Sequence, residues 1–228
     1  MKNLIAIGLG SVLALSSAAP APAHSLKSLE EQLHKREKYF QAFNKEAPVF
    51  ALRDAAGRTI SSSDLCGKVV VLNFVYTNCP DVCPLHAERI AEVQGMVNQT
   101  PMRDRVRFIT VTTDPRNDTP AVMRTYGENH GLDSVNWSFL TSGPKRLNLT
   151  RDLVRQFGHK FTKQGDCYQV HGVVTHVIEL EGRWRANFYG LKFQPVNLVL
   201  FINALTNDIQ GGNAMPRVLA ANQNVSLK

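Results

Sequence analysis

The sequence predicts an α/β domain over residues 48–207, with a central mixed sheet flanked by helices and an added β-hairpin. Apolar, strand-like segments alternate with helix-like segments along this region, which is the pattern of α/β folds. The most apolar segment, residues 69–76 (VVVLNFVY), suits a strand that is buried on both faces. Hydrophobic residues make up 43% and charged residues 20% of the 228-residue chain. A chain of this size buries a core without disulfides, so its four cysteines call for a chemical explanation.

The expected elements follow one another in a simple order. Strands are expected at residues 49–53, 59–60, 69–76, 105–113, 137–140, 170–180 and 183–189. Helices are expected at residues 84–96, 120–130, 145–158 and 195–206. The last two strands form the hairpin, around Glu181-Gly182. Residues 24–47 are dense in charge and predict an N-terminal helical extension.

The two ends of the chain predict an exported protein. Residues 1–23 combine Lys2, a short apolar run and the sequence Ala21-Pro22-Ala23, which together indicate a signal peptide cut after Ala23. The alternative is an N-terminal membrane anchor, although the apolar run is shorter than the roughly 20 residues that span a bilayer. A periplasmic or other extracytoplasmic location follows. Residues 208–228 are expected to form a disordered tail.

The formal net charge of +7 has several interpretations. Nucleic acid is excluded as a partner because the chain is predicted to be exported and has no basic-aromatic motif. The scattered basic residues fit an ordinary solvated surface, or docking to an acidic partner or an anionic membrane face. Peripheral membrane association therefore stays open.

Cys79 and Cys83 follow the most apolar strand, where a helix is expected to begin. At this spacing in the first turn of a helix, both sulfurs reach one metal ion or each other. The free N–H groups of a helix N-terminus favour thiolate, and thiolates select Cu(I), zinc or iron–sulfur clusters. The alternative is a purely structural role, either as a disulfide or as two buried cysteines. A redox pair is normally C-x-x-C, one residue shorter, and no proline lies between Pro144 and Pro195 to clamp a substrate.

Two thiolates leave a metal under-coordinated, so a histidine is the expected third ligand. The candidates are His34, His86, His130, His159, His171 and His176, besides His24 at the predicted mature terminus. His86 lies three residues after Cys83 and could face the same side of the helix. His171 and His176 are five apart in one predicted strand and therefore point to opposite faces. Only one of these two can face the cysteines.

Residues 67–84 (GKVVVLNFVYTNCPDVCP) contain the apolar strand followed by the sequence C-P-x-x-C-P. With this strand and signature, residues 45–207 resemble the Sco/SenC family of copper-binding proteins, which have a thioredoxin-like fold. Residues 111–120 (VTTDPRNDTP) are similar to its D-P-x-x-D-T-P run, and residues 137–141 (WSFLT) also fit. Residues 170–182 (VHGVVTHVIELEG) match the family's ligand stretch without a gap if His171 is the third copper ligand.

The chain departs from the family pattern at three points. Val170 replaces the usual aspartate, and His176 stands at the tyrosine position, which makes His176 the second choice for the ligand. Two further cysteines, Cys66 and Cys167, are present. A Cys66–Cys167 disulfide is expected in an oxidising compartment, provided that the Cα atoms come within about 7 Å. The alternative is that Cys167 modulates the copper site.

The resemblance implies a metallochaperone that carries Cu(I) or Cu(II) and helps to build the CuA centre of a respiratory oxidase. Its partners would be the copper-bearing oxidase subunit and other copper carriers. The alternative is an enzyme, a thiol–disulfide oxidoreductase in which Cys79 attacks and Cys83 resolves. The residues by themselves support a thiolate–imidazole copper site, and His171 separates the two functions because dithiol exchange does not need it.

Overall fold

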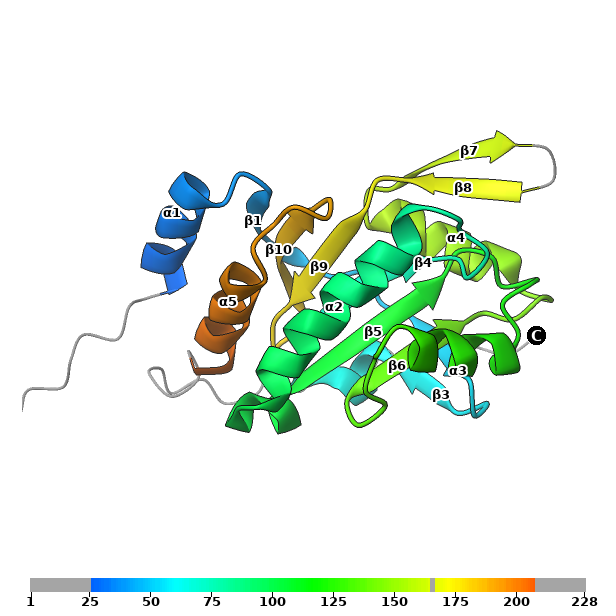
Figure 1. Cartoon of the computed structure of the whole chain (residues 1–228), viewed down its shortest axis with the longest axis horizontal. Coiled ribbons are helices and arrows are strands. Elements are labelled where there is room, and N and C mark those ends of the chain that lie inside the picture. The colour runs from blue at the N-terminus through cyan, green and yellow to red at the C-terminus, as the bar shows by residue number, and fades with distance from the viewer. Residues whose placement is uncertain (1–25, 165–166, 208–228) are drawn as a thin grey trace, which may run out of the picture.

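The computed structural model describes residues 26–164 and 167–207, with the backbone alone for 161–164 and 167–171. The predicted signal peptide and C-terminal tail lie outside the described residues. The centre of the molecule is an eight-stranded mixed sheet with the strand order β1-β10-β9-β4-β5-β6-β2-β3 (Figure 1). In that order the strands are Phe40–Glu46, Arg183–Tyr189, Val174–Ile178, Val69–Val75, Val106–Thr112, Trp137–Thr141, Ala51–Asp54 and Thr59–Ser61. The central pairs β4–β5 and β5–β6 are parallel, as the α/β prediction requires, and the other pairs are antiparallel.

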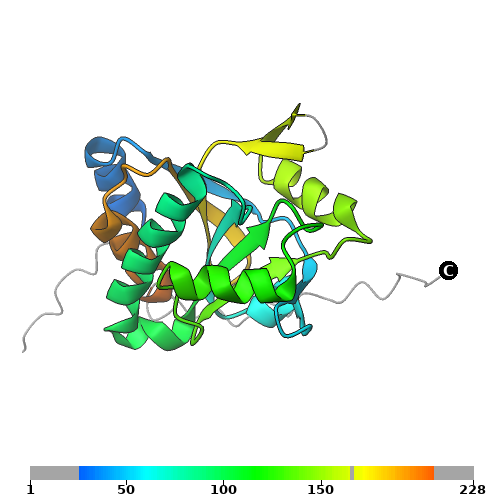
Figure 2. The same ribbon diagram turned by 45° about the vertical axis from the view of Figure 1, so that its right-hand side comes forward.

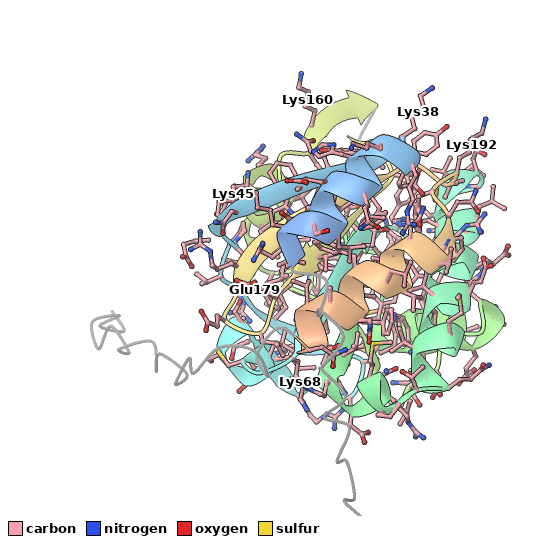
Figure 3. The ribbon with its side chains drawn as sticks, turned by 90° about the vertical axis from the view of Figure 1, so that its left-hand side faces the viewer. Lys38, Lys45, Lys68, Lys160, Glu179 and Lys192 are labelled. Carbon is pink, nitrogen blue, oxygen red and sulfur yellow. The ribbon has the colours of Figure 1, made fainter. Side chains whose placement is uncertain are left out.

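Helices cover both faces of this sheet (Figure 2). The described α-helices are α1 (Leu26–Arg36), α2 (Val82–Asn98), α3 (Pro120–Asn129), α4 (Leu147–Gln156) and α5 (Pro195–Asn207), and the 3-10 turns are η1 (Ser62–Leu65) and η2 (Pro101–Arg105). Alternate residues of β4 divide between two cores. Val69, Val71 and Val75 face α1, α2, α3 and α5, whereas Val70, Leu72 and Phe74 face α4. Figure 3 shows α1 and α5 side by side at one end of the molecule.

The sequence places α2 directly after β4 and determines which side of it is buried. Cys83, His86, Ala87, Ile90, Val93, Gln94 and Val97 are buried. They recur every three or four residues and form one stripe against the sheet. This stripe fixes the rotation of the helix, so Cys83 faces inward at its first turn.

Two expectations about secondary structure are wrong. The predicted helix over residues 24–47 ends at Arg36, and the chain continues as β1, an edge strand that pairs with β10. The single strand expected at residues 170–180 is two strands, β8 (Cys167–His171) and β9, which are separated at Gly172. Gly172 has φ of 95°, a conformation that breaks a strand and that glycine adopts freely.

Strand β8 pairs with β7 (Lys160–Gln164) in a separate two-stranded sheet that the sequence did not predict. This β7–β8 hairpin extends beyond the end of the main sheet, close to the start of α2 (Figure 1). The expected hairpin between β9 and β10 is confirmed.

Candidate metal centre

Cys79 and Cys83 lie together at the carboxyl end of β4. Cys79 belongs to the loop between β4 and α2, and its amide donates to the carbonyl of Tyr76 at 3.2 Å. The helix expected to begin at residue 84 begins at Val82, so Cys83 is its second residue. Cys79 lies before the helix, and only one of the two cysteines is helical. Both side chains are more than nine-tenths buried. The structure therefore brings the two predicted sulfur ligands to one place.

The two thiols are electrostatically different. Burial acts to raise the pKa of Cys79, but hydrogen bonds from the Cys83 thiol and from the amides of Asp81 and Cys83 outweigh it, and this pKa lies below its ordinary value. Burial, reinforced by the hydrogen bond to Cys79, raises the pKa of Cys83 to about 12. The free amides of the first turn of α2 thus stabilise a thiolate on Cys79. Cys83 stays a thiol that donates to it.

Asp118 holds the cysteine loop in place. Its buried carboxylate accepts hydrogen bonds from the hydroxyls of Thr77 and Thr112, and from the amide of Thr77 at 3.3 Å. Thr119, not Asp118, caps α3 by accepting from the amide of Val122. The D-P-x-x-D-T-P run therefore supplies one residue that starts a helix and another that braces the loop.

Tyr126 is a second support for the site. Its buried hydroxyl donates to the carbonyl of Cys83 at 2.9 Å. Burial, followed by the negative potential of Cys83 and Cys79, raises the pKa of Tyr126, which keeps the hydroxyl protonated as a donor. No sequence pattern predicts this contact, since Tyr126 is distant in the chain from Cys83 and lies in no recognised motif.

A hollow of about 300 Å³ opens beside the two cysteines. Its lining includes Cys79, Cys83, Phe74, Gly172 and Val173. Gly172 directly follows His171, the last residue of β8. The backbone thus brings the predicted third ligand to the edge of the hollow, although the side chain of His171 is not among those described.

The rival ligand His176 lies on the other face of the sheet. It is fully buried, and its ring nitrogens contact His159 Nε2 at 2.9 Å and Asn187 Oδ1 at 2.7 Å. Its neighbour Thr175 faces α2 instead and contacts His86. The side chain of His176 is therefore committed to a polar cluster away from the cysteines.

His86, the third candidate, lines the hollow but is already engaged. Its Nε2 contacts Thr175 Oγ1 at 2.9 Å. Burial lowers the pKa of His86 to about 4, so the ring is neutral at physiological pH. Among the side chains that the structure describes, no three histidine, cysteine or acidic groups are arranged to hold a metal ion. His86 therefore does not complete a metal site with the two cysteines among the described side chains.

The expected Cys66–Cys167 disulfide is not formed. Cys66 is a free, exposed cysteine. The amide of Gly67 donates to the carbonyl of Leu180, which puts Cys66 beside the far end of β9, whereas Cys167 precedes the near end. A separate hollow of about 440 Å³, lined mostly by apolar residues, lies next to Cys66 and does not reach the cysteine pair. Cys66 therefore lies at one end of the main sheet, and Cys167 begins a strand of the separate β7–β8 sheet beyond the other end.

Comparison with known proteins agrees with this geometry. The SCO1/SenC family model matches residues 39–198. The chain belongs to this family. The SCO1 protein homolog of Bacillus subtilis is 24% identical over 158 residues, which cover 69% of this chain and 80% of that protein. An SCO2-like protein of Rickettsia prowazekii is 29% identical over 143 residues, which cover 61% and 67%.

Solved SCO1/SenC structures share the fold. A family lipoprotein from Bacillus anthracis superposes with a TM-score of 0.65 at 24% identity, covering 72% of this chain and 97% of that one. ScoI of Bradyrhizobium japonicum, solved with copper bound, gives a TM-score of 0.58 at 25% identity, covering 70% and 99%. The predicted thioredoxin-like fold is confirmed. No helix within residues 26–164 and 167–207 of this SCO1/SenC chain is both long and apolar enough to cross a membrane.

The unequal thiols lead to a direct test of reactivity in the reduced protein. Limiting iodoacetamide at neutral pH is expected to modify Cys79 well before Cys83, because the lowered pKa supplies thiolate on Cys79. The rate at Cys79 should rise with pH and level off below the pH at which an ordinary thiol does. Peptide mass spectrometry over time measures both sites. Faster modification of Cys83 would contradict the assignment.

Proposed function

We propose that this SCO1/SenC chain is a copper-binding metallochaperone that assists assembly of the CuA centre of a respiratory oxidase, through a site formed by Cys79, Cys83 and His171. The observation that carries the proposal is the shared hollow: both cysteines and Gly172, the neighbour of His171, line it. The family relationship supports the wider role. One of the structural relatives is described as a member of the Sco family of cytochrome c oxidase assembly proteins.

The chemistry of the donors suits copper that must be passed on. Two sulfurs and one imidazole favour copper in both oxidation states, and three protein ligands leave a position open for exchange. Cys79 is already biased toward thiolate, whereas Cys83 has to lose its proton when the metal binds. Copper loading is therefore expected to release a proton and to strengthen as the pH rises. We place this activity outside the cytoplasm, with the chain cut after Ala23.

A second function, thiol–disulfide exchange, is favoured by the same asymmetry. The Cys79 thiolate would attack a partner disulfide and form a mixed disulfide, and one partner thiol would leave. Cys83 would lose its proton and attack Cys79, so that the second partner thiol is released and Cys79–Cys83 is oxidised. His171 has no role in that sequence.

A copper titration of the reduced protein tests the proposed site. The wild type is expected to bind about one copper per chain and to show thiolate-to-copper charge-transfer absorption with Cu(II). His171→Ala is expected to weaken binding at least about 100-fold, because loss of a second-shell group alone costs 10- to 100-fold. His176→Gln tests the rival ligand, and His34→Ala, which removes an exposed histidine of α1, is the control that should bind as the wild type does.

The opposite pattern would reverse the ligand assignment. Unchanged binding by His171→Ala, together with a loss in His176→Gln, would make His176 the ligand. Thiol–disulfide exchange that proceeds normally in His171→Ala while copper binding is lost would show that one cysteine pair serves both functions.

A further inference from the structure

Three buried side chains beneath the β7–β8 hairpin form a hydrogen-bonded series that the proposed copper site does not use. His159, His176 and Asn187 are 7%, 0% and 4% exposed. His159 Nε2 lies 2.9 Å from His176 Nε2, and His176 Nδ1 lies 2.7 Å from Asn187 Oδ1. Buried polar groups of this kind are costly unless each finds a partner. Each of the three has such a partner here, so together they form a satisfied polar network inside an aromatic core.

The direction of each hydrogen bond follows from the contacts. Trp184 Nε1 donates to Asn187 Oδ1 at 2.8 Å, which makes Oδ1 the acceptor for His176 Nδ1 as well. Burial, with the neighbouring His159, holds the pKa of His176 well below its ordinary value, so this ring is neutral and its Nε2 carries no proton. His159 Nε2–H must then be the donor in the contact between the two histidines.

The series continues to the edge of the sheet. Asn187 Nδ2 donates to the hydroxyl of Tyr189 at 3.0 Å, and that hydroxyl donates to Gln41 Oε1 at 2.7 Å. Every bond runs in the same direction, from His159 through β9 and β10 to β1. Hydrogen bonds in such a series polarise and strengthen one another. His159 is thereby attached to three strands of the main sheet.

His159 is also the residue at which the hairpin begins. Lys160, the next residue, starts β7 and pairs with His171 at the end of β8. Lys160 is exposed, and Figure 3 shows its side chain pointing away from the body of the molecule, so it does not fasten the hairpin. The two hairpin strands form their own sheet, and an isolated two-stranded hairpin is only marginally stable. The position of His171 thus depends on how the base of the hairpin is held.

The histidine pair also lies directly behind the hollow. Phe74 lines the hollow, and its ring meets the His159 ring edge-on, with centroids 5.1 Å apart and planes at 76°. The centroids of Phe74 and His176 are 5.8 Å apart. One aromatic side chain therefore separates the polar series from the space beside Cys79.

We propose that His159 and His176 are positioning residues for the copper site: their hydrogen bond fixes the base of the β7–β8 hairpin to β9 and sets the point at which His171 meets the hollow. This inference rests on the proposed function. The histidine at position 176, where the family pattern has tyrosine, then forms part of this anchor.

Two substitutions at one position separate the hydrogen bond from the packing. His159→Leu keeps an apolar group against Phe74 but removes the donor, whereas His159→Gln keeps an N–H that reaches His176. Hydrogen exchange of the copper-free protein is the first measurement. His159→Leu is expected to speed exchange of the β7–β8 amides about tenfold and to leave β4 and β5 unchanged. His159→Gln should exchange as the wild type does.

A copper titration on the same variants tests the link to His171. His159→Leu is expected to weaken copper binding about tenfold, as loss of a second-shell contact typically does. In a His171→Ala background the same change should have an effect of less than about twofold, since the group being positioned is gone. If His159→Leu does not fold, His159→Asn, whose amide is too short to reach His176, takes its place.

The outcomes distinguish this inference from the proposed function. An equal loss of copper affinity with and without His171 would overturn the inference, because His159 would then act by some other route. Unchanged hairpin exchange in His159→Leu would overturn it as well. A third outcome would be copper binding that is unchanged in His171→Ala but weakened in His159→Leu. That result would show that His171 is not a copper ligand, and it would overturn both the ligand assignment and the inference that His159 positions His171.

Discussion

Combining Cys79→Ser with Cys83→Ser is expected to abolish copper binding, the largest effect that the structure predicts. Both sulfurs line the hollow beside the hairpin, and no other described cysteine does. A serine hydroxyl is a harder donor than a thiolate and does not ionise near neutral pH, so it cannot replace a soft ligand for Cu(I). Competition for Cu(I) against a chelator of known affinity, with thiols kept reduced, measures the loss.

The two single variants should differ in a way that reports on the unequal thiols. Cys83→Ser keeps a hydroxyl that can still donate to Cys79, so the thiolate on Cys79 should persist and give weak binding. Cys79→Ser leaves only Cys83, whose pKa burial, the largest cause of its rise, still holds above the ordinary value, and this variant should bind copper more weakly still at neutral pH. Cys66→Ser is the matched control. Cys66 is exposed at the other end of the sheet, and its replacement should change nothing. Copper binding retained in the double variant would exclude the proposed site.

The sequence predicts correctly those features that depend on residues close together in the chain. The spacing of Cys79 and Cys83 after an apolar strand located the sulfur pair, because a strand followed by a helix leaves few arrangements for the turn between them. The alternation of strands and helices likewise predicted the parallel centre of the sheet. The prediction failed at residues 40–46, where charges obscure Phe40 and Phe43. These two aromatic residues pack on Phe188 and Trp184 of β10, about 140 residues further along the chain.

The errors around His171 have one cause. A continuous strand from residue 170 to residue 180 would place His171 and His176 by simple alternation, but Gly172 interrupts it and ends the separate β7–β8 hairpin. The disulfide prediction failed for a related reason. The sequence indicates that each cysteine lies near the end of a strand. The antiparallel pairing of β9 with β4 decides which end of the main sheet each cysteine is near, and sequence spacing does not predict that pairing. Neither fact is encoded within a short window of residues.

The role of Asp118 also depends on distant contacts. The motif drew attention to this residue, which stands two positions before the first residue of α3. The cap is Thr119, and Asp118 instead reaches across 41 residues to Thr77. Sequence spacing distinguishes poorly between a cap and a brace, because both roles favour the same short polar side chains before a helix.

Asp118→Ala is accordingly expected to destabilise the protein and loosen the cysteine loop. The change leaves the amide of Thr77 and the hydroxyls of Thr77 and Thr112 without their buried acceptor. The cost of unsatisfied buried donors is on the order of 3 kcal/mol in the free energy of unfolding. For a chain of this size that lowers Tm by about 10 °C. Copper affinity should fall about tenfold as well, since the loop that carries Cys79 loses its brace.

Two companion variants separate the brace from a general effect of removing a charge. Burial raises the pKa of Asp118, outweighing the hydrogen bonds from Thr112 and Thr77 that lower it, so a neutral side chain is tolerated in this position. Asp118→Asn keeps an oxygen acceptor for Thr77 and should recover much of the stability and copper affinity. Asp114→Ala removes an acid from the same motif, where its carboxylate contacts only the exposed side chain of Asn117 among the described residues, and should leave both quantities near the wild-type values. A loss of copper affinity in Asp114→Ala equal to that in Asp118→Ala would show that negative charge near the site, not the bond to Thr77, is what the cysteine loop requires.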